Sequence, residues 1–387
     1  MKPHFLMFFV SYPLLCQSIL RIPLKKLPRE SHRLSPHKAV NRWKREEPEN
    51  EKPVFVYDSA TYGMVGIGTP IQEIPLMFDT FGNETWVFES DCTIKICFVT
   101  NTFKFSKSST FNYLGVVKQK YYKEFLLRGA ATTDTFIFGN FKMDNVTFIG
   151  VQDIDWTASV ERAHTESVAG IIHLRPSAMT GSTDFLEKMY SEKIIEEKIF
   201  GIKVPSYKDN NVDGEITIGE WNRQYVNESA INWIPLTSGS SWEFHVQKLV
   251  YGTFGLLEEG KAIVDTGLSL LVGPEEIVQK LFMALNITLT INPITVTSFL
   301  SDYDSFTVKC SDKLPYFNFL IHDNHYVLTP NDYLLPMPDN KDLCVFGFAS
   351  SKHIKTKAWR LGDVFLSKFY MIGDGKNSRL SFNDYVL

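Results

Sequence analysis

After its first residues, the sequence contains no apolar run long enough to cross a membrane. The one early apolar run, residues 5–15, is shorter than the ~20 residues that a membrane-spanning helix needs. Alanine-rich segments and leucine heptads are scarce, which disfavours a mainly helical fold. These absences exclude a protein built on transmembrane helices and point to a globular chain.

Several common catalytic signatures are also absent. The sequence has no His-Glu-x-x-His zinc motif, no Gly-x-Ser-x-Gly turn, no Walker-type loop and no Rossmann fingerprint. The segment His-Asp-Asn-His at 322–325 offers metal-ligating side chains, but its composition is more typical of a turn beside a strand. We therefore expect neither a metal nor a cofactor.

The composition is that of a folded, mostly β protein. The chain has 387 residues, enough for two sizeable domains, and is 44% hydrophobic with 30 phenylalanines. Short runs rich in β-branched and aromatic residues, such as Glu-Ile-Thr-Ile-Gly-Glu at 215–220, are separated by Gly, Asn and Asp. This pattern predicts many short strands joined by turns.

The N-terminus has the pattern of a secretory signal. Lys2 precedes the apolar run, and Cys16-Gln17-Ser18 resembles a cleavage site, so we expect residues 1–18 to be removed before Ile19. The alternative is an apolar leader without a targeting role. A signal predicts a secreted, extracellular protein in which disulfides are stable.

The cysteines and sequons agree with secretion. Four cysteines remain after the signal, and they allow three pairings. Proximity favours Cys92–Cys97, which leaves Cys310–Cys344. Four Asn-x-Ser/Thr sequons are glycosylation candidates: Asn145, Asn227, Asn286 and Asn83.

Positive charge is concentrated at the beginning of the chain. Residues 1–45 carry ten lysines and arginines against Glu30 alone, although the whole chain has a net charge of −4. Such a strip is either a solvated tail, a nucleic-acid arm or a propeptide held to an acidic body. Secretion disfavours nucleic acid. We therefore expect residues 19–53 to be a basic propeptide that acid releases by protonating carboxylates of the body.

An Asp-Thr pair occurs twice, each time after an apolar run. The segments are PLMFDTFGNETWVF at 75–88 and KAIVDTGLSLLVG at 261–273. The repeat predicts an N-terminal lobe at 54–226 and a C-terminal lobe at 227–387, each supplying one aspartate. The alternative is that each aspartate only caps a turn.

Two facing carboxylates offer a specific chemistry. They cannot both ionise cheaply, so they share one proton. The ionised partner can take a proton from water, and the protonated partner can polarise a carbonyl. Water then adds directly to a peptide bond.

These segments resemble the pepsin-like aspartic peptidases, a family that is itself the standard example of the shared-proton dyad. The resemblance runs from Ile22 to the C-terminus and includes YGMVGIGTP at 62–70, AIVDTGLSLLVGP at 262–274 and WRLGDVFLSKFYMIGD at 359–374. The leader ILRIPLKKLP at 19–28 is similar to that of the pregnancy-associated glycoproteins, a secreted branch of the family. The resemblance implies an all-β, bilobal fold with a cleft between two similar lobes.

The resemblance also implies roles for individual residues and a zymogen that acts on peptides or proteins as a monomer. Its partners are then a peptide and its own propeptide. The implied site residues are the catalytic pair Asp79 and Asp265, the dyad-supporting Thr80, Thr266 and Gly267, and the cleft residues Tyr122 (on the flap) and Trp86.

The sequence departs from the family around both aspartates. Without gaps, Phe81 takes the position of a glycine, and Gly82 that of a Ser or Thr whose hydroxyl binds the outer carboxylate oxygen. Leu268 replaces the same hydroxyl in the second lobe. A gapped alignment would make Phe81 an insertion. A side chain at this turn is expected to strain or displace the backbone, or to fill the cleft.

Other departures surround the dyad. Lys123, Glu124 and Phe125 make the flap bulkier, and His173 stands where the family has a glycine behind the first aspartate. A lone buried histidine is usually a satisfied structural residue. Asn83 lies inside the catalytic turn, so its amide is expected to be partly buried.

Two functions follow from this pattern. The departures predict a secreted homologue with lost or reduced activity that still binds peptides in its cleft. The alternative is an active, acid-optimum aspartic endopeptidase that cleaves proteins between bulky apolar residues. Whether the chain is an enzyme therefore depends on Phe81, Gly82 and Leu268.

Overall fold

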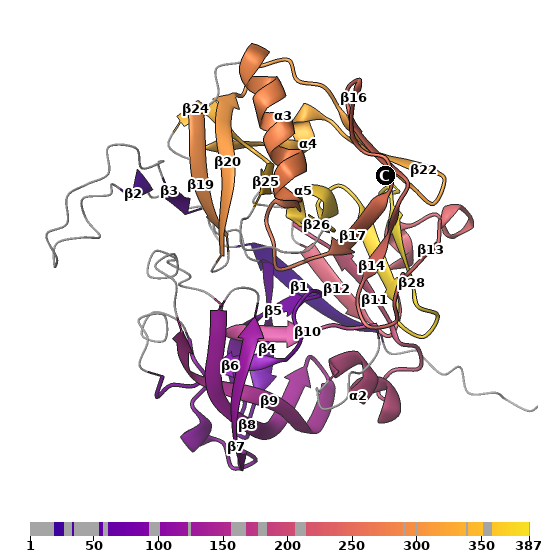
Figure 1. Cartoon of the computed structure of the whole chain (residues 1–387). Coiled ribbons are helices and arrows are strands. Elements are labelled where there is room, and N and C mark those ends of the chain that lie inside the picture. The colour runs from indigo at the N-terminus through magenta and orange to yellow at the C-terminus, as the bar shows by residue number, and fades with distance from the viewer. Residues whose placement is uncertain are drawn as a thin grey trace, which may run out of the picture.

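The computed structural model shows a mostly β protein with two lobes (Figure 1). None of the helices in the described part is long and apolar enough to cross a bilayer. The described residues are 19–26, 33–34, 54–56, 61–92, 101–122, 125–155, 168–176, 184–205, 214–288, 292–298, 301–337, 340–350 and 358–386.

The larger sheet runs through the first lobe and into the second. Along it, neighbouring strands are β13 (Ile234–Pro235), β28 (Arg379–Asn383), β27 (Tyr370–Asp374), β11 (Ile199–Lys203), β12 (Gly214–Ile218), β1 (Leu20–Lys26), β4 (Thr61–Ile67), β5 (Gln72–Asp79), β10 (Gly170–His173), β6 (Trp86–Phe88), β9 (Phe141–Asp155), β8 (Phe125–Phe138) and β7 (Asn112–Tyr122).

Two further sheets build the second lobe. The first contains β14 (Glu243–Val246), β17 (Gly260–Val264), β26 (Trp359–Leu361), β18 (Leu271–Gly273), β25 (Phe348–Ser350), β20 (Ser301–Lys309), β19 (Asn292–Ser298), β3 (Val54–Val56) and β2 (Arg33–Leu34), with β24 (Asn340–Phe346) between β20 and β23 (Leu334–Met337). The other contains β16 (Phe254–Leu257), β15 (Lys248–Tyr251), β21 (Phe317–Ile321) and β22 (Asn324–Leu328).

Helices are short apart from one that covers the second lobe (Figure 1). The Asp184 side chain caps the N-terminus of α2 by accepting a hydrogen bond from the Glu187 N–H. The helices are α2 (Phe185–Ser191), α3 (Glu275–Thr288), α4 (Pro330–Tyr333) and α5 (Asp363–Leu366), and the 3-10 turns are η2 (Phe105–Lys107), η4 (Arg223–Tyr225) and η5 (Glu228–Ala230).

The two Asp-Thr segments lie in equivalent arrangements of strands. In the first lobe β5 pairs in parallel with β10, which pairs antiparallel with β6. In the second lobe β17 pairs in parallel with β26, which pairs antiparallel with β18. Ile171 of β10 lies opposite the residue two before Asp79, and Arg360 of β26 lies opposite the residue two before Asp265. Arg360 therefore occupies the position that Ile171 has in the first lobe.

Strand β1, which lies in the leader, is part of the larger sheet. Leu20, Ile22 and Leu24 alternate with exposed residues and are buried, as a strand with one covered face requires. The strand pairs with β12 and β4, and Lys26 Nζ lies 3.3 Å from Asp363 Oδ2. The division of the chain into signal, propeptide and two lobes remains a prediction.

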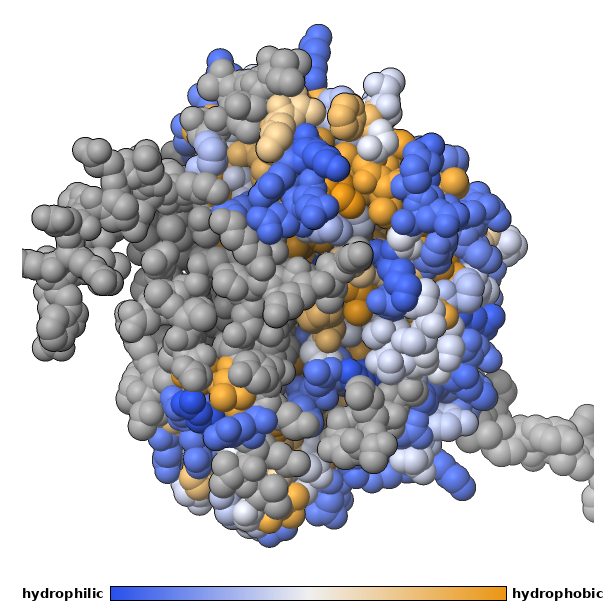
Figure 2. Space-filling model, viewed as in Figure 1, coloured by the Kyte–Doolittle hydropathy of each residue, from blue (hydrophilic) through white to orange (hydrophobic). Residues whose placement is uncertain are grey.

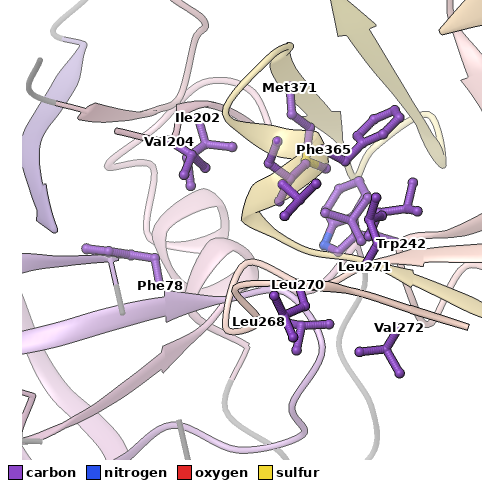
Figure 3. Packing of buried hydrophobic residues seen from close by; sticks show 14 of the residues in the cluster. Phe78, Ile202, Val204, Trp242, Leu268, Leu270, Leu271, Val272, Phe365 and Met371 are labelled. Atoms are coloured by element: carbon purple, nitrogen blue, oxygen red, sulfur yellow. The ribbon is translucent and has the colours of Figure 1, made fainter. Parts of the chain in front are cut away.

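Aromatic and aliphatic side chains fill both lobes. In Figure 3 the labelled side chains of Trp242, Phe365 and Leu271 gather in one region of the core, and the Trp242 indole N–H donates to the Leu174 carbonyl at 2.9 Å. Cys310 and Cys344 form the predicted disulfide. Cys92 is also disulfide-bonded, and Cys97 lies outside the described residues.

Candidate active site

The two aspartates are placed by a reciprocal grip between threonines of the two lobes. The Thr80 N–H donates to Thr266 Oγ1 at 3.1 Å, and the Thr266 N–H donates to Thr80 Oγ1 at 3.2 Å. Each hydroxyl also donates across to the other lobe, Thr80 to the Val264 carbonyl at 2.8 Å and Thr266 to the Phe78 carbonyl at 2.6 Å. The grip holds the chain just before and just after Asp79 and Asp265.

The turn after Asp79 is closed in spite of Phe81. The Phe81 N–H donates to Asp79 Oδ1 at 3.0 Å, and the Gly82 N–H donates to Oδ2 at 3.1 Å. Phe81 does not have a positive φ, so its side chain causes no left-handed strain. The Gly267 N–H donates to Asp265 Oδ1 at 3.1 Å in the same way, which supports the ungapped alignment. Of the expected outcomes, backbone strain of the left-handed kind is absent at Phe81.

Asp265 has a cationic partner that the repeat did not predict. Arg360 Nε donates to Asp265 Oδ2 at 2.8 Å, and Arg360 Nη2 donates to the same oxygen. Asp265 is fully buried and Arg360 is 2% exposed. Leu268, which replaces the expected hydroxyl, turns into the core and is also buried. The guanidinium thus takes the outer oxygen that has no hydroxyl partner from Leu268.

The Phe81 ring packs on this guanidinium. The Arg360 guanidinium carbon lies 4.3 Å from the centroid of the Phe81 ring, a cation–π arrangement across the two lobes. Phe81 is half-buried. Phe81 is the departure from a symmetrical dyad in the first lobe, and Arg360 is the departure in the second. These two side chains are therefore in direct contact with each other.

In the sequence, Arg360 belongs to the family-like segment 359–374, and no role was predicted for it. The neighbouring residues could have indicated a role, because Arg360 lies between the apolar residues Trp359 and Leu361. These three residues form a short strand that is buried throughout. A buried arginine needs an acidic partner. The repeat of strands then indicates which one, since β26 runs beside β17 and ends near Asp265.

A second set of polar residues supports the first aspartate. His173 Nδ1 lies 2.9 Å from the Asp79 carbonyl oxygen, and Arg175 Nε donates to His173 Nε2 at 3.0 Å. Burial, and then the charge of Arg175, lowers the pKa of His173 to about 3. His173 is therefore neutral, with Nδ1–H donating to the carbonyl. It is a satisfied structural residue, as predicted.

The same arginine reaches the turn that follows Asp79. Arg175 Nη2 donates to Asn83 Oδ1. Asn83 is nevertheless exposed, so the expectation of a partly buried amide is wrong. The carboxamide oxygen binds the buried Arg175 while the residue as a whole stays exposed.

The residues predicted to line the cleft lie in the first lobe. Trp86 begins β6 and is 1% exposed, with its ring at 5.0 Å from that of Phe88. Tyr122 ends β7 and pairs with Phe125, which places its backbone at the tip of the β7–β8 hairpin. Lys123 and Glu124, expected to make the flap bulkier, lie outside the described residues.

The imidazoles of the His-Asp-Asn-His segment bind asparagines. His322 Nδ1 lies 3.0 Å from Asn232 Oδ1, and His325 Nδ1 lies 3.0 Å from Asn318 Oδ1. His322 and Asp323 form the turn between β21 and β22, and Asn324 and His325 begin β22, which agrees with the predicted turn beside a strand.

Comparisons with known proteins agree with this arrangement. The family described as eukaryotic aspartyl protease matches residues 60–385. Cathepsin E of Mus musculus is 28% identical over 340 residues, which cover 86% of this chain and 81% of the relative. Chymosin of Camelus dromedarius is 28% identical over 336 residues, which cover 85% and 82%. Gastricsin of Homo sapiens is 26% identical over 395 residues, which cover 96% and 97%. With its paired Asp-Thr turns and its repeated lobes, the chain belongs to the pepsin-like family of aspartyl proteases.

Proposed function

We propose that this protein is a secreted pepsin-like homologue whose catalytic site is disabled and whose cleft binds peptides without cleaving them. The observation that carries the proposal is the buried ion pair between Arg360 and Asp265. Peptide binding rests on the family, whose members act on peptides, and on the β7–β8 hairpin, which pairs as far as Tyr122 and Phe125.

The ion pair removes the proton that the chemistry needs. In a working dyad, two carboxylates share one proton, and that proton polarises the carbonyl of the substrate. A guanidinium stays protonated in proteins. Beside Asp265 it supplies the positive charge that the shared proton would supply, so both carboxylates can be ionised together. The site then contains a base but not the acid.

Phe81 supports the same conclusion. Its ring covers the guanidinium from the side of the first lobe, so the arginine is held between an aromatic face and a carboxylate. A charged group with both contacts is not easily displaced, because leaving them would expose Asp265 as a buried, unpaired charge.

Secretion and membership of the pregnancy-associated branch are parts of the proposal. They are supported by residues 1–18, which have the pattern of a signal, and by the leader at 19–28. An active acid endopeptidase is the second candidate, and the intact threonine grip favours it.

Turnover of an unfolded protein substrate between pH 3 and pH 7, with and without pepstatin, tests the proposal. The acid-treated protein is compared with Arg360→Ile, which copies Ile171 of the first lobe, and with Arg360→Ile/Phe81→Gly/Gly82→Ser. We expect no turnover by the unaltered protein and pepstatin-sensitive turnover by at least the triple variant. Adding Asp79→Asn to the active variant should abolish it.

Three results would contradict the proposal. Pepstatin-sensitive turnover by the unaltered protein would show a working peptidase. Silence of every correctly folded variant would show that Arg360 and Phe81 are not what disables the site. Binding is measured by the fluorescence anisotropy of labelled peptides prepared by digesting the same substrate. If the unaltered protein does not bind these peptides, the proposed binding function is wrong.

A further inference from the structure

A cavity of about 320 Å³ lies in the second lobe, built from elements that do not carry the two aspartates. This volume is in the range of small-molecule sites. One wall is the η5 turn, another is the β21–β22 hairpin, and a third is the C-terminal segment after β28. Figures 1 and 2 place hydrophilic residues on the side of the molecule where β13, β22 and β28 lie. The lining includes Asn227, Asn324, Tyr326, Asn383, Asp384 and Tyr385.

The sequon of Asn227 is at the edge of this cavity. Asn227 lines the cavity and is exposed, and it caps η5. Its Oδ1 accepts hydrogen bonds from the Ser229 N–H at 3.2 Å and from Ser229 Oγ at 2.8 Å. These bonds use the oxygen of the carboxamide and leave the nitrogen, the atom to which a glycan is attached, for modification.

The walls are mainly carboxamides and aromatic side chains, with Asp384 and His325 as their acidic and basic groups, and they suit a ligand rich in hydroxyl groups. Carboxamides contribute donors and acceptors without net charge. The hydrogen bonds of Asn324 and Asn383 use the amide nitrogen, so their carbonyl oxygens can accept from ligand hydroxyls. Tyr326 and Tyr385 also line the cavity and combine an aromatic ring with a polar end. The phenolic oxygen of Tyr385 is buried without a hydrogen-bond partner in the described part of the chain.

We propose that the cavity is a carbohydrate site whose occupant is the first sugar of a glycan attached to Asn227. Attachment at the rim makes binding intramolecular, so even weak contacts hold the sugar in place. The sugar would cover Tyr385 and join η5 to the C-terminal segment. This inference rests on entry into the secretory pathway, which is part of the proposed function.

Glycosylation in a mammalian secretory host tests the site. The chain is expressed once with residues 1–18 and once with a heterologous signal, so that a defective native signal is distinguished from an unmodified Asn227. Mass spectrometry of glycopeptides gives the occupancy at Asn227 and at Asn145. Asn145 is the matched control, because it lies in the first-lobe strand β9, exposed and with a φ of 51°.

Release by an endoglycosidase then measures protection. We expect release from Asn227 to be at least about tenfold slower than from Asn145 in the native protein, and equal after unfolding. Tyr385→Ala should remove most of this protection, and Asp384→Ala at the exposed rim is the second variant should Tyr385→Ala fail to fold. An unoccupied Asn227 in secreted protein, or equal native rates at the two sites, would overturn the proposal, as would unchanged protection in both variants.

Discussion

Arg360 places its Nε 2.8 Å from Oδ2 of Asp265 and occupies the position that an isoleucine occupies in the other lobe. The repeat of the fold therefore provides an internal reference for what the second lobe has changed. An apolar residue beside the aspartate leaves its charge to be balanced by a proton, whereas an arginine balances it permanently. The proposed effect of Arg360 is therefore on the protonation of the site, since the strand pairings around the two aspartates are equivalent.

Arg360→Ile should destabilise the protein more at pH 7 than at pH 4. Removing one partner of a buried ion pair typically costs about 3–5 kcal/mol. Near pH 4 a proton shared by the two aspartates can replace the lost cation. Between pH 7 and pH 4 the aspartate pair of the folded variant then binds more protons than the same two residues in the unfolded chain, so the loss caused by Arg360→Ile shrinks as the pH falls. Urea unfolding at both pH values measures the difference. Arg360→Lys keeps the charge and is the control, and equal losses at both pH values for Arg360→Ile would contradict the prediction.

The contact between Phe81 and Arg360 should appear as a coupling in a double-mutant cycle. Phe81→Leu keeps an apolar side chain and removes the aromatic face, and we expect it to lower the free energy of unfolding by about 1–2 kcal/mol. In an Arg360→Ile background the same change should have a smaller effect, because the cation is gone. Phe138→Leu is the control for the loss of an aromatic ring, because the Phe138 ring packs on Phe185 of α2. Phe81 effects that simply add to those of Arg360→Ile would show that the contact contributes nothing.

The aspartates could be predicted from the sequence, but the arginine between Asp265 and Phe81 was not. Asp79 and Asp265 each belong to a short local pattern, an apolar strand followed by Asp-Thr, that needs no knowledge of distant residues. The effect of Phe81 depends on Arg360, which approaches Asp265 from 95 positions away because β26 runs parallel to β17. Asn83 similarly meets Arg175, which lies 92 positions further along the chain. Contacts of this kind follow from topology, which a local pattern does not contain.

The threonine grip should contribute measurably to the stability of the whole molecule. Thr266→Val keeps the shape of the buried side chain and removes its hydroxyl. The change leaves the Phe78 carbonyl and the Thr80 N–H without their partner, at about 1–3 kcal/mol for each buried polar group. We expect a total loss of about 2–4 kcal/mol by guanidinium unfolding. Thr266→Ser retains the hydroxyl and should lose less than half as much, and equal losses for both variants would show that the hydroxyl bonds are unimportant.

Neutral His173 should make the protein lose stability in acid. Because burial lowers its pKa to about 3, the folded protein does not bind the proton that the unfolded chain binds below about pH 6.5. Stability therefore falls as the pH decreases from about 6.5 to 3, by roughly 4 kcal/mol in total. In His173→Gln the dependence on pH over this window should be much shallower, even though the variant is less stable near pH 7.

Titration of Asp184 changes the stability in the direction opposite to that of His173. The two contributions therefore have to be measured separately. Burial raises the pKa of Asp184 to about 6, so the folded protein holds a proton that the unfolded chain has released above about pH 4. This group contributes stability in acid that is lost as the pH rises through 6. Asp184→Asn removes that contribution, and in this background the acid loss caused by His173 should be steeper. Free energies of unfolding from pH 3 to pH 7 for the two single variants and the double variant provide the measurement, and parallel curves for the unaltered protein and His173→Gln would disprove the role of the histidine.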